Sequence, residues 1–346
     1  MTPVFGAESK GEYAERINES PQFIKGRFRN FGAKRADMTF AKMPKLISES
    51  NKSKIERKPK RKIKWLKRER AEFEEKHTDD FRVTWFGHSA LLIEMEGLRF
   101  AIDPMLGQAA APLPVAVRRF HKSVPLKAKD FPELDAVIYT HDHYDHLDYG
   151  SVKHLKNKVK HWYAPLGVGA HLRRWGIHAE NITEVDWWEE NTLDHLKLIS
   201  TSNQHFSGRT FGGRDKTLWC SWVIEGKKNK IFFNGDSGYY DGFRIIGEKY
   251  GPFDLCFMEC GQYHYMWKEN HMTPEESALA FTELKGEKLI PIHWGAFTLA
   301  PHSWTDPIER MSHTCEEEGI KLITPRIGET VILDKYEPKT KWWENA

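Results

Sequence analysis

One short stretch of the chain, residues 141–148, holds three histidines and three aspartates within eight positions. Carboxylates and imidazoles at this density are costly to place together unless a cation holds them. His141 and His143 lie two residues apart, so extended backbone would point both side chains the same way. Asp145 and His146 follow after a turn and could bind a second ion. Imidazole and carboxylate ligands suit Zn²⁺, with iron or manganese as alternatives.

The elements around this motif predict where it lies in the fold. It follows a β-rich run at residues 135–140 (DAVIYT) and precedes a helix-like run at residues 147–157 (LDYGSVKHLKN). The motif therefore occupies a loop at the end of a buried strand, where a rigid scaffold can hold catalytic groups. Each of the further candidates follows another β-rich run, and they are His205, Asp236 and His293. If these strands are neighbours, all the candidate ligands converge on one rim and can hold a pair of metal ions.

The character of the chain changes once along its length. Residues 1–79 are polar, basic and weakly periodic, whereas strand-like and helix-like runs alternate through residues 80–335. This alternation predicts a layered α/β domain behind an N-terminal extension, with residues 336–346 as a C-terminal tail. Within the extension, residues 20–32 alternate aromatic with charged side chains, which predicts extended packing against a neighbour. Residues 62–77 predict a short helix.

Basic residues are concentrated in one segment of the extension. Residues 52–70 hold eleven Lys or Arg and two Glu, a local charge of +9, so a net charge of +3 leaves −6 for the rest. A basic segment on a mildly acidic protein favours contact with an anionic membrane surface or with nucleic acid. A solvated arm without a partner is the alternative.

The remaining composition excludes several classes of protein. The four cysteines form no CxxC pair, and nothing in their spacing requires an oxidising compartment. The longest apolar run, residues 109–117, contains two prolines and is far shorter than the roughly 20 residues needed to cross a bilayer. The N-terminal region lacks the apolar core of a signal peptide. These features predict a cytoplasmic or peripherally membrane-associated protein, or an exported one whose leader has been removed.

The pattern H-x-H-x-D-H, followed by a distant His, a Gly-Asp pair and a final His, resembles the metallo-β-lactamase-fold hydrolases. Longer stretches over roughly residues 80–330 resemble the branch of that family that acts as an N-acyl-phosphatidylethanolamine-hydrolysing phospholipase D. They include VTWFGHSALLIEM, HDHYDHLDYGSV, EVDWWEEN, FFNGDSGY, HMTPEESALAF and IHWGAFTLA. The resemblance implies an αββα sandwich, with two mixed β-sheets inside, helices on the outer faces, and two bound zinc ions. It also suggests a homodimer.

Matched position by position, the resemblance implies a set of ligands for each zinc ion. The first zinc would be held by His141, His143 and His205. The second would be held by Asp145, His146 and His293. Asp236 would bridge the two ions, so that Asp145 and Asp236 would take part in catalysis through the metals.

Three further residues match positions beside the family's metal centre. Asp103 is implied to orient a ligand histidine, and His88 to lie near the site. His271 matches a histidine near the reaction centre and would contact the substrate or the transition state. It immediately precedes a predicted capping box of Thr273 and Glu276, so a fixed helix entrance would hold it.

The expected chemistry is hydrolysis of a phosphodiester. A pair of zinc ions would lower the pKa of a shared water from about 15.7 toward roughly 7, which yields a hydroxide that can attack phosphorus. The resemblance implies a phospholipid substrate, with phosphatidic acid and an N-acylethanolamine as products. Residues 105–120 place an apolar, proline-punctuated run beside Arg118 and Arg119, which would rest at a membrane interface and bind the substrate phosphate.

Two other functions stay open from the sequence. One is a metal-dependent lactonase or another small-molecule phosphodiesterase that uses the same site. The other, from a different class, is a non-catalytic protein that binds zinc or a membrane. A nucleic-acid substrate is disfavoured because the chain lacks the further motifs of the RNA-processing branch. The chain also departs from the phospholipase pattern at Asp142, where that branch has a neutral amide, and around His205 (residues 203–213).

Overall fold

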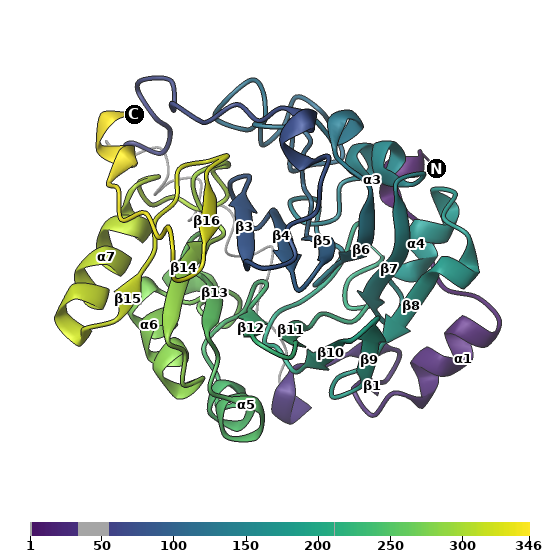
Figure 1. The fold of residues 1–346 in the computed structure, drawn as a ribbon. Coiled ribbons are helices and arrows are strands. Elements are labelled where there is room, and N and C mark those ends of the chain that lie inside the picture. The colour runs from purple at the N-terminus through teal and green to yellow at the C-terminus, as the bar shows by residue number, and fades with distance from the viewer. Residues whose placement is uncertain (1, 34–54, 211) are drawn as a thin grey trace.

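The computed structural model describes residues 2–33, 55–210 and 212–346, so part of the predicted basic segment, residues 52–54, lies outside the described chain. Within the described residues, two seven-stranded mixed β-sheets face each other, with helices on their outer sides (Figure 1). This arrangement confirms the predicted α/β class and the αββα sandwich.

The first sheet comes from the first half of the domain plus one strand from its end. In spatial order its strands are β16 (Thr330–Ile332), β3 (Arg82–Trp85), β4 (Leu91–Met95), β5 (Leu98–Ile102), β6 (Leu134–Ile138), β7 (Val159–Pro165) and β8 (Ile182–Val185). Neighbours from β16 to β5 are antiparallel, and neighbours from β5 to β8 are parallel.

The second sheet comes from the second half of the domain. In spatial order its strands are β15 (Lys321–Leu322), β14 (Lys288–Ile292), β13 (Leu255–Glu259), β12 (Lys230–Phe233), β11 (Ser221–Glu225), β10 (Leu196–Thr201) and β9 (Glu190–Leu193). Strands β12 to β15 are parallel, whereas β9 to β12 are antiparallel. Parallel neighbours end at the same edge, which brings the loops after them together.

Helices cover the outer faces of both sheets. They are α3 (Tyr149–Leu155), α4 (Gly169–Arg174), α5 (Gly242–Tyr250), α6 (Pro274–Glu283) and α7 (Asp306–Glu318). In Figure 1, α3 and α4 lie beside β6 to β8, whereas α5 to α7 lie beside β12 to β15. The predicted capping box opens α6, because Thr273 Oγ1 accepts from the Glu276 amide and Glu276 accepts from the Thr273 amide.

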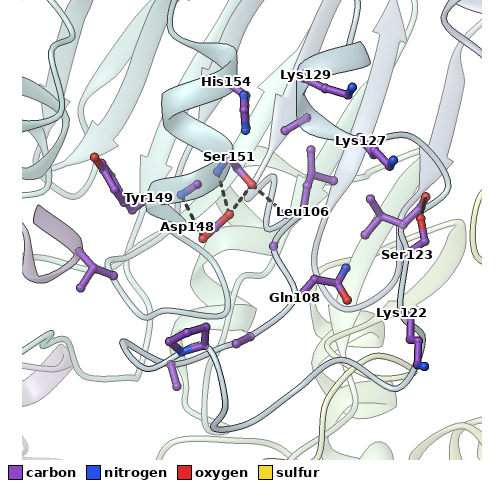
Figure 2. Close-up of a pocket in the computed structure, with 18 of the residues that line it drawn as sticks. Leu106, Gln108, Lys122, Ser123, Lys127, Lys129, Asp148, Tyr149, Ser151 and His154 are labelled. Carbon is purple, nitrogen blue, oxygen red and sulfur yellow. Dashed lines mark hydrogen bonds between the residues drawn. The ribbon is translucent and has the colours of Figure 1, made fainter.

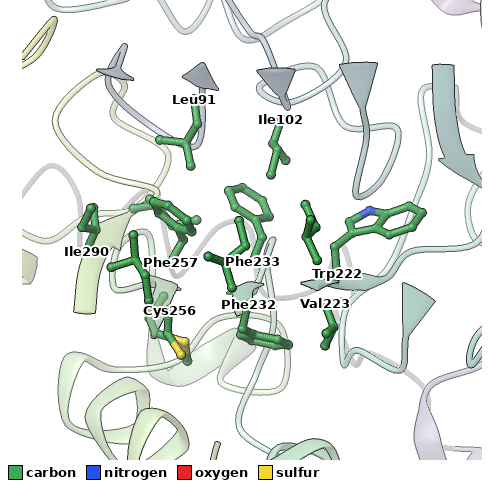
Figure 3. Packing of buried hydrophobic residues seen from close by; sticks show 14 of the residues in the cluster. Leu91, Ile102, Trp222, Val223, Phe232, Phe233, Cys256, Phe257 and Ile290 are labelled. Atoms are coloured by element: carbon green, nitrogen blue, oxygen red, sulfur yellow. The ribbon is translucent and has the colours of Figure 1, made fainter. Parts of the chain in front are cut away.

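The core between the sheets follows the two-residue period of the strands. Leu91 and Ile102 of the first sheet point toward Phe233 and Phe257 of the second (Figure 3). Leu92, one position along β4, belongs to a second cluster under the outer helices. Each fully buried side chain of this size stabilises the fold by about 1.5–3 kcal/mol. This packing fixes the strand ends that carry the polar loops.

The N-terminal extension packs against the domain. It contains α1 (Glu12–Glu19) and a small hairpin of β1 (Phe23–Ile24) and β2 (Arg27–Phe28), which agrees with the extended structure predicted for residues 20–32. Phe28 is buried, and its amide donates to the carbonyl of Asp215 at 2.8 Å. The extension is therefore fastened to the loop that follows β10.

The helix predicted for residues 62–77 is wrong. Within residues 62–77 the structure has one 3₁₀ turn, Arg70–Phe73, and the residues before it have no regular secondary structure. The Leu66 amide donates to Ile327 at 2.8 Å, and the Arg68 amide donates to Pro125 at 2.9 Å. Because these amides bond to distant carbonyls, they do not form the i→i−4 ladder of a helix. Elsewhere in the described residues, the 3₁₀ turns are Pro3–Phe5, Phe31–Ala33, Ala128–Asp130, Ala179–Asn181, Tyr265–Trp267 and Trp342–Asn345.

Candidate metal centre

Loops after the ends of four strands carry the predicted ligands, and the structure brings them together between the two sheets. The loop after β6 carries His141, His143, Asp145 and His146. The loops after β10, β12 and β14 of the opposite sheet carry His205, Asp236 and His293. Each sheet therefore supplies part of one site.

The first group of ligands is made of three imidazoles and one carboxylate. His143 Nδ1 lies 3.0 Å from His141 Nε2 and 3.2 Å from His205 Nε2. Asp236 Oδ2 lies 3.6 Å from His141 Nε2 and 3.8 Å from His205 Nε2. Four donor atoms that converge within 4.8 Å of one another form a cage of the size that a divalent metal needs.

The second group lies beside the first and shares Asp236 with it. Asp236 Oδ2 lies 3.0 Å from His146 Nε2 and 3.1 Å from His293 Nε2. Asp145 Oδ2 lies 3.3 Å from His293 Nε2 and 2.8 Å from His88 Nε2. One oxygen of Asp236 thus stands between the two groups, in the position from which a carboxylate bridges two ions.

Hydrogen bonds on the far side of each ring fix the nitrogen that faces the centre. His146 Nδ1 donates to Asp103 Oδ2 at 2.7 Å, and Asp103 also accepts from Thr140 Oγ1 at 2.6 Å. His205 Nδ1 donates to the carbonyl of Asn270 at 3.0 Å. These bonds leave the Nε2 lone pairs of His146 and His205 directed at the site, which is how outer hydrogen bonds orient metal ligands.

Comparison with known proteins agrees with this geometry. Residues 98–294 match the family described as "Beta-lactamase superfamily domain". An uncharacterised protein of Mycobacterium tuberculosis is 40% identical over 266 residues, which cover 75% of this chain and 71% of that protein. The N-acyl-phosphatidylethanolamine-hydrolyzing phospholipase D 1 of Caenorhabditis elegans is 32% identical over 275 residues, 72% of this chain and 77% of the relative. The chain belongs to the metallo-β-lactamase superfamily.

A solved structure gives the same fold. Igni18, a metallo hydrolase from the archaeon Ignicoccus hospitalis, aligns with a TM-score of 0.56 at 23% identity, over 73% of this chain and 98% of its own. As a member of the metallo-β-lactamase superfamily the chain is a hydrolase, and its candidate metal groups fit a metal-dependent one.

The charges at the site of this metallo-β-lactamase-fold hydrolase favour a cation. Burial alone would raise the pKa of Asp236, but His146 and His293 hold it well below its usual range. Burial would lower the pKa of His293, but Asp236 and Asp145 reverse this and raise it to about 10. The carboxylates thus draw protons onto the neighbouring rings. Bound cations would supply that positive charge in place of the protons.

An unpaired atom points to the same conclusion. Asp236 Oδ1 is buried and has no hydrogen-bond partner among the described residues. A buried carboxylate oxygen without a partner is costly in a protein interior. A bound metal would satisfy it, so the residues present fit a metal pair.

Glu259 is a site residue that the sequence analysis did not identify. It ends β13, is fully buried, and its Oε2 lies 2.8 Å from Nδ1 of His271. The same oxygen lies 3.5 Å from Nδ1 of His293. His271 itself stacks on His293 at a centroid distance of 5.0 Å, beside the metal groups. An acid that closes an apolar strand (DLCFME) was the available signal.

Asn30 is the second residue that was missed. Its Oδ1 accepts from the backbone amide of His205 and from Nε1 of Trp219, both at 2.9 Å. The N-terminal extension therefore contributes directly to the loop that carries a candidate ligand. Only the contact reveals this role, because 175 residues separate Asn30 from His205.

Asp142, the extra acid of the motif, turns away from both metal groups. Its Oδ1 accepts from the amide of Gly208 at 2.8 Å, and its Oδ2 lies 3.3 Å from Nε2 of His171. Arg209 is buried and donates to the carbonyls of Asp142 and Leu147 at 2.6 and 2.8 Å. Asp142 therefore ties the histidine loop to the loop after His205.

The two arginines predicted to bind substrate phosphate lie in different environments. Arg118 is exposed, whereas Arg119 is buried and donates to the carbonyls of Met105 and Gly107 at 2.7 and 3.1 Å. The Arg119 guanidinium also lies 4.6 Å from the centre of the Phe297 ring. The structure therefore has Arg119 holding the 105–120 loop in place, while Arg118 faces solvent. Among the described helices, none is long and apolar enough to span a bilayer.

Proposed function

We propose that the chain is a dinuclear zinc phosphodiesterase of the phospholipase D type. Its substrate would be an N-acyl-phosphatidylethanolamine-like phospholipid, and its products phosphatidic acid and an N-acylethanolamine. The observation that carries the proposal is the group of His141, His143, His205 and Asp236. The same Asp236 oxygen also lies 3.0 Å from His146 Nε2 and 3.1 Å from His293 Nε2, beside Asp145. The relative from Caenorhabditis elegans, whose name states this activity, supports the choice of substrate.

The donor set determines which residues would hold the ions. One ion would be held by His141, His143, His205 and Asp236. The other would be held by Asp145, His146, His293 and Asp236. When bound, zinc acidifies a water molecule for attack on phosphorus and neutralises charge on the phosphoryl oxygens.

The residues around the metals have separate tasks in this proposal. His271 would face the substrate through Nε2, because its Nδ1 is bonded to Glu259. From there it would donate a proton to the departing alcohol oxygen, a role that general-acid histidines fill in many hydrolases. Asp103 would keep the ring of His146 in its ligand orientation.

A substrate panel tests the proposal. Purified protein would be assayed on N-acyl-phosphatidylethanolamine, phosphatidylcholine, an acyl-homoserine lactone and a cyclic nucleotide, with metal content measured on the same sample. We expect about two zinc ions per chain and the highest kcat/KM on the N-acylated phospholipid. A lactone preference, or turnover that does not depend on metal, would refute the proposal.

Two buried aspartates give a matched pair of variants for this panel. Asp236→Asn removes the shared ligand and should abolish turnover together with metal binding. Asp142→Asn changes an equally buried acid that lies outside both ligand groups, and should keep both. Equal losses in the two variants would show that buried charge, rather than ligation, matters at this site.

A further inference from the structure

A cavity lies outside the metal centre. It has a volume of about 530 Å³ and lies between the 105–129 loop and the start of α3 (Figure 2). Its apolar wall includes Leu106, Ala109, Pro112 and Pro114. Among the described residues that line it, none is a candidate metal ligand. The cavity is therefore a separate feature that hydrolysis at the metal centre does not explain.

The charged lining of this cavity is mostly cationic. Figure 2 shows Lys122, Lys127 and Lys129 along one side, with Asp148 and Tyr149 opposite. Asp148 is engaged, because it accepts from the amide of Ser151 at 2.8 Å as the N-cap of α3. The three lysines are exposed, and none forms an ion pair with any residue in the described part of the chain. The cavity thus offers positive charge that the protein does not neutralise.

The lip of the cavity is apolar and projects into solvent. Leu113 and Val115 are 64% and 77% exposed, and they alternate with Pro112 and Pro114 of the cavity wall. Proline restricts the backbone, so the tip keeps its shape without packing partners. An aliphatic tip beside unpaired lysines matches the surface region of a lipid bilayer, where acyl chains lie next to phosphates.

The described part of the basic segment lies beside the same surface. The Arg68 amide donates to the carbonyl of Pro125, next to Val124 in the cavity wall. Lys62 and Lys64 of the basic segment are exposed to solvent. The described part of the basic segment therefore passes beside the loop that lines the cavity.

A chain of contacts links this surface to the metal centre. Arg119, which holds the base of the loop, stacks over Phe297, and the Phe297 ring lies 5.2 Å from that of His88. His88 Nε2 lies 2.8 Å from Asp145. The loop that carries the exposed tip is therefore connected through packed side chains to the candidate metal ligands.

We propose that the cavity and its lip form a docking site for a bilayer that contains anionic phospholipid. The lysine ammonium groups bind lipid phosphates through charge-assisted hydrogen bonds, and Leu113 and Val115 enter the acyl region. This site is distinct from the metal centre, and it holds the protein at the surface whether or not the bound lipid is hydrolysed.

Vesicle co-sedimentation tests the docking site. The full chain would be mixed with vesicles of phosphatidylcholine, or of equal parts phosphatidylcholine and phosphatidylglycerol. Lys122→Gln/Lys127→Gln/Lys129→Gln should lower partitioning onto the anionic vesicles about a hundredfold, since each lysine near such a surface contributes about a factor of five. Leu113→Ser/Val115→Ser should lower it at least about tenfold, because two buried aliphatic side chains are lost.

A matched triple variant controls for overall charge. Lys227→Gln/Lys228→Gln/Lys285→Gln removes the same charge from exposed positions, two of them in the turn between β11 and β12. Partitioning that falls equally in both triple variants would overturn the proposal, because it would show diffuse attraction. Unchanged partitioning in the cavity variant would also overturn it.

Two further measurements distinguish the sources of phosphate and the two sites. Inorganic phosphate, added at the vesicle phosphate concentration, should leave the wild-type protein bound. Displacement would indicate a site for soluble phosphate and overturn the docking proposal. Turnover of a water-soluble phosphodiester should be the same in the cavity variants and the wild type, so failure of docking can be told from failure of the proposed function.

Discussion

The carboxylate of Glu259 lies 2.8 Å from Nδ1 of His271 and accepts from the amide of Met272 at 2.9 Å. Burial raises the pKa of this carboxyl, and His271 partly offsets that rise. Glu259 thus holds the Nδ1 edge of a ring that stacks on His293. The pair gives His271 one orientation at the edge of the metal centre.

Substitution of this pair should separate proton transfer from metal binding. His271→Asn is expected to lower kcat by about 10²–10⁴, the usual contribution of a general acid or base, with metal content unchanged. Glu259→Gln should lower kcat by a smaller factor and leave KM nearly constant, because it loosens the ring without removing it. Steady-state kinetics with metal analysis measures both effects. A loss of metal in His271→Asn would make this residue a ligand instead.

Asp103→Asn should weaken metal binding about 10–100-fold, the usual cost of removing an outer partner of a ligand histidine. The reason is that Asp103 accepts from His146 Nδ1 at 2.7 Å and fixes the ring. Competition against a chromophoric chelator measures the change. Asp241→Asn, at an exposed position, is the control and should bind metal like the wild type. Equal affinities in the two variants would contradict this role for Asp103.

Arg119→Gln and Arg118→Gln should differ in stability although the residues are neighbours. Burial lowers the pKa of Arg119 to about 10, yet its guanidinium donates to two carbonyls and stacks on Phe297. Loss of these buried contacts should cost about 2–4 kcal/mol of unfolding free energy. The exposed Arg118 should change it by less than about 0.5 kcal/mol. Denaturant unfolding measures both free energies. Similar values for the two variants would show that Arg119 does not stabilise the loop.

Asn30→Ala should destabilise the protein by about 1–3 kcal/mol, because the His205 amide would lose its buried acceptor, whereas Trp219 Nε1 keeps the carbonyl of Asn203 at 3.2 Å. Asn18→Ala, at an exposed position of α1, should stay within about 0.5 kcal/mol of the wild type. Thermal or denaturant unfolding tests the difference. If the two alanine variants are equally stable, the extension does not support the histidine loop.

His121 should contribute to a loss of stability in acid. Burial and the charge of Arg119 lower its pKa to about 4, against about 6.5 for an exposed histidine. Between these values the unfolded chain binds a proton that the folded chain does not, so stability falls as the pH drops from 6.5 to 4. His121→Gln should remove about 2–3 kcal/mol of this fall.

The control for His121 is His178→Gln, because His178 is exposed. Denaturant unfolding at a series of pH values would compare both variants with the wild type. The His178 variant should follow the wild-type profile. A His121 variant that follows it too would show that the imidazole is not kept neutral by burial.

Most of the framework of the site could be predicted from the sequence. Histidines and acids after β-rich runs indicated a common rim, and strand ends do bring His205, Asp236 and His293 to the 141–146 loop. The helix α6 followed from its capping box, because that signal lies within four residues. Local patterns of this kind can be predicted because the residues that interact are close together in the sequence.

Other features could not be predicted, because distant contacts decide them. Arginine often binds phosphate in proteins. The guanidinium of Arg119, however, donates its hydrogen bonds to carbonyls of its own loop. Residues 62–77 have a helical pattern, but their amides bond to Pro125 and Ile327 instead. Asn30 looks like an ordinary loop residue until the fold places it beside His205.

The division of the ligands between two sheets has a consequence for biosynthesis. Asp145 and His293 are 148 residues apart, so a ribosome that adds about 5–20 residues per second needs roughly 7–30 s to pass from one to the other. During that interval the nascent chain presents a half-sandwich with an uncovered apolar face and an incomplete set of imidazoles. The complete set of candidate ligands can therefore assemble only after the second sheet has emerged and closed onto the first.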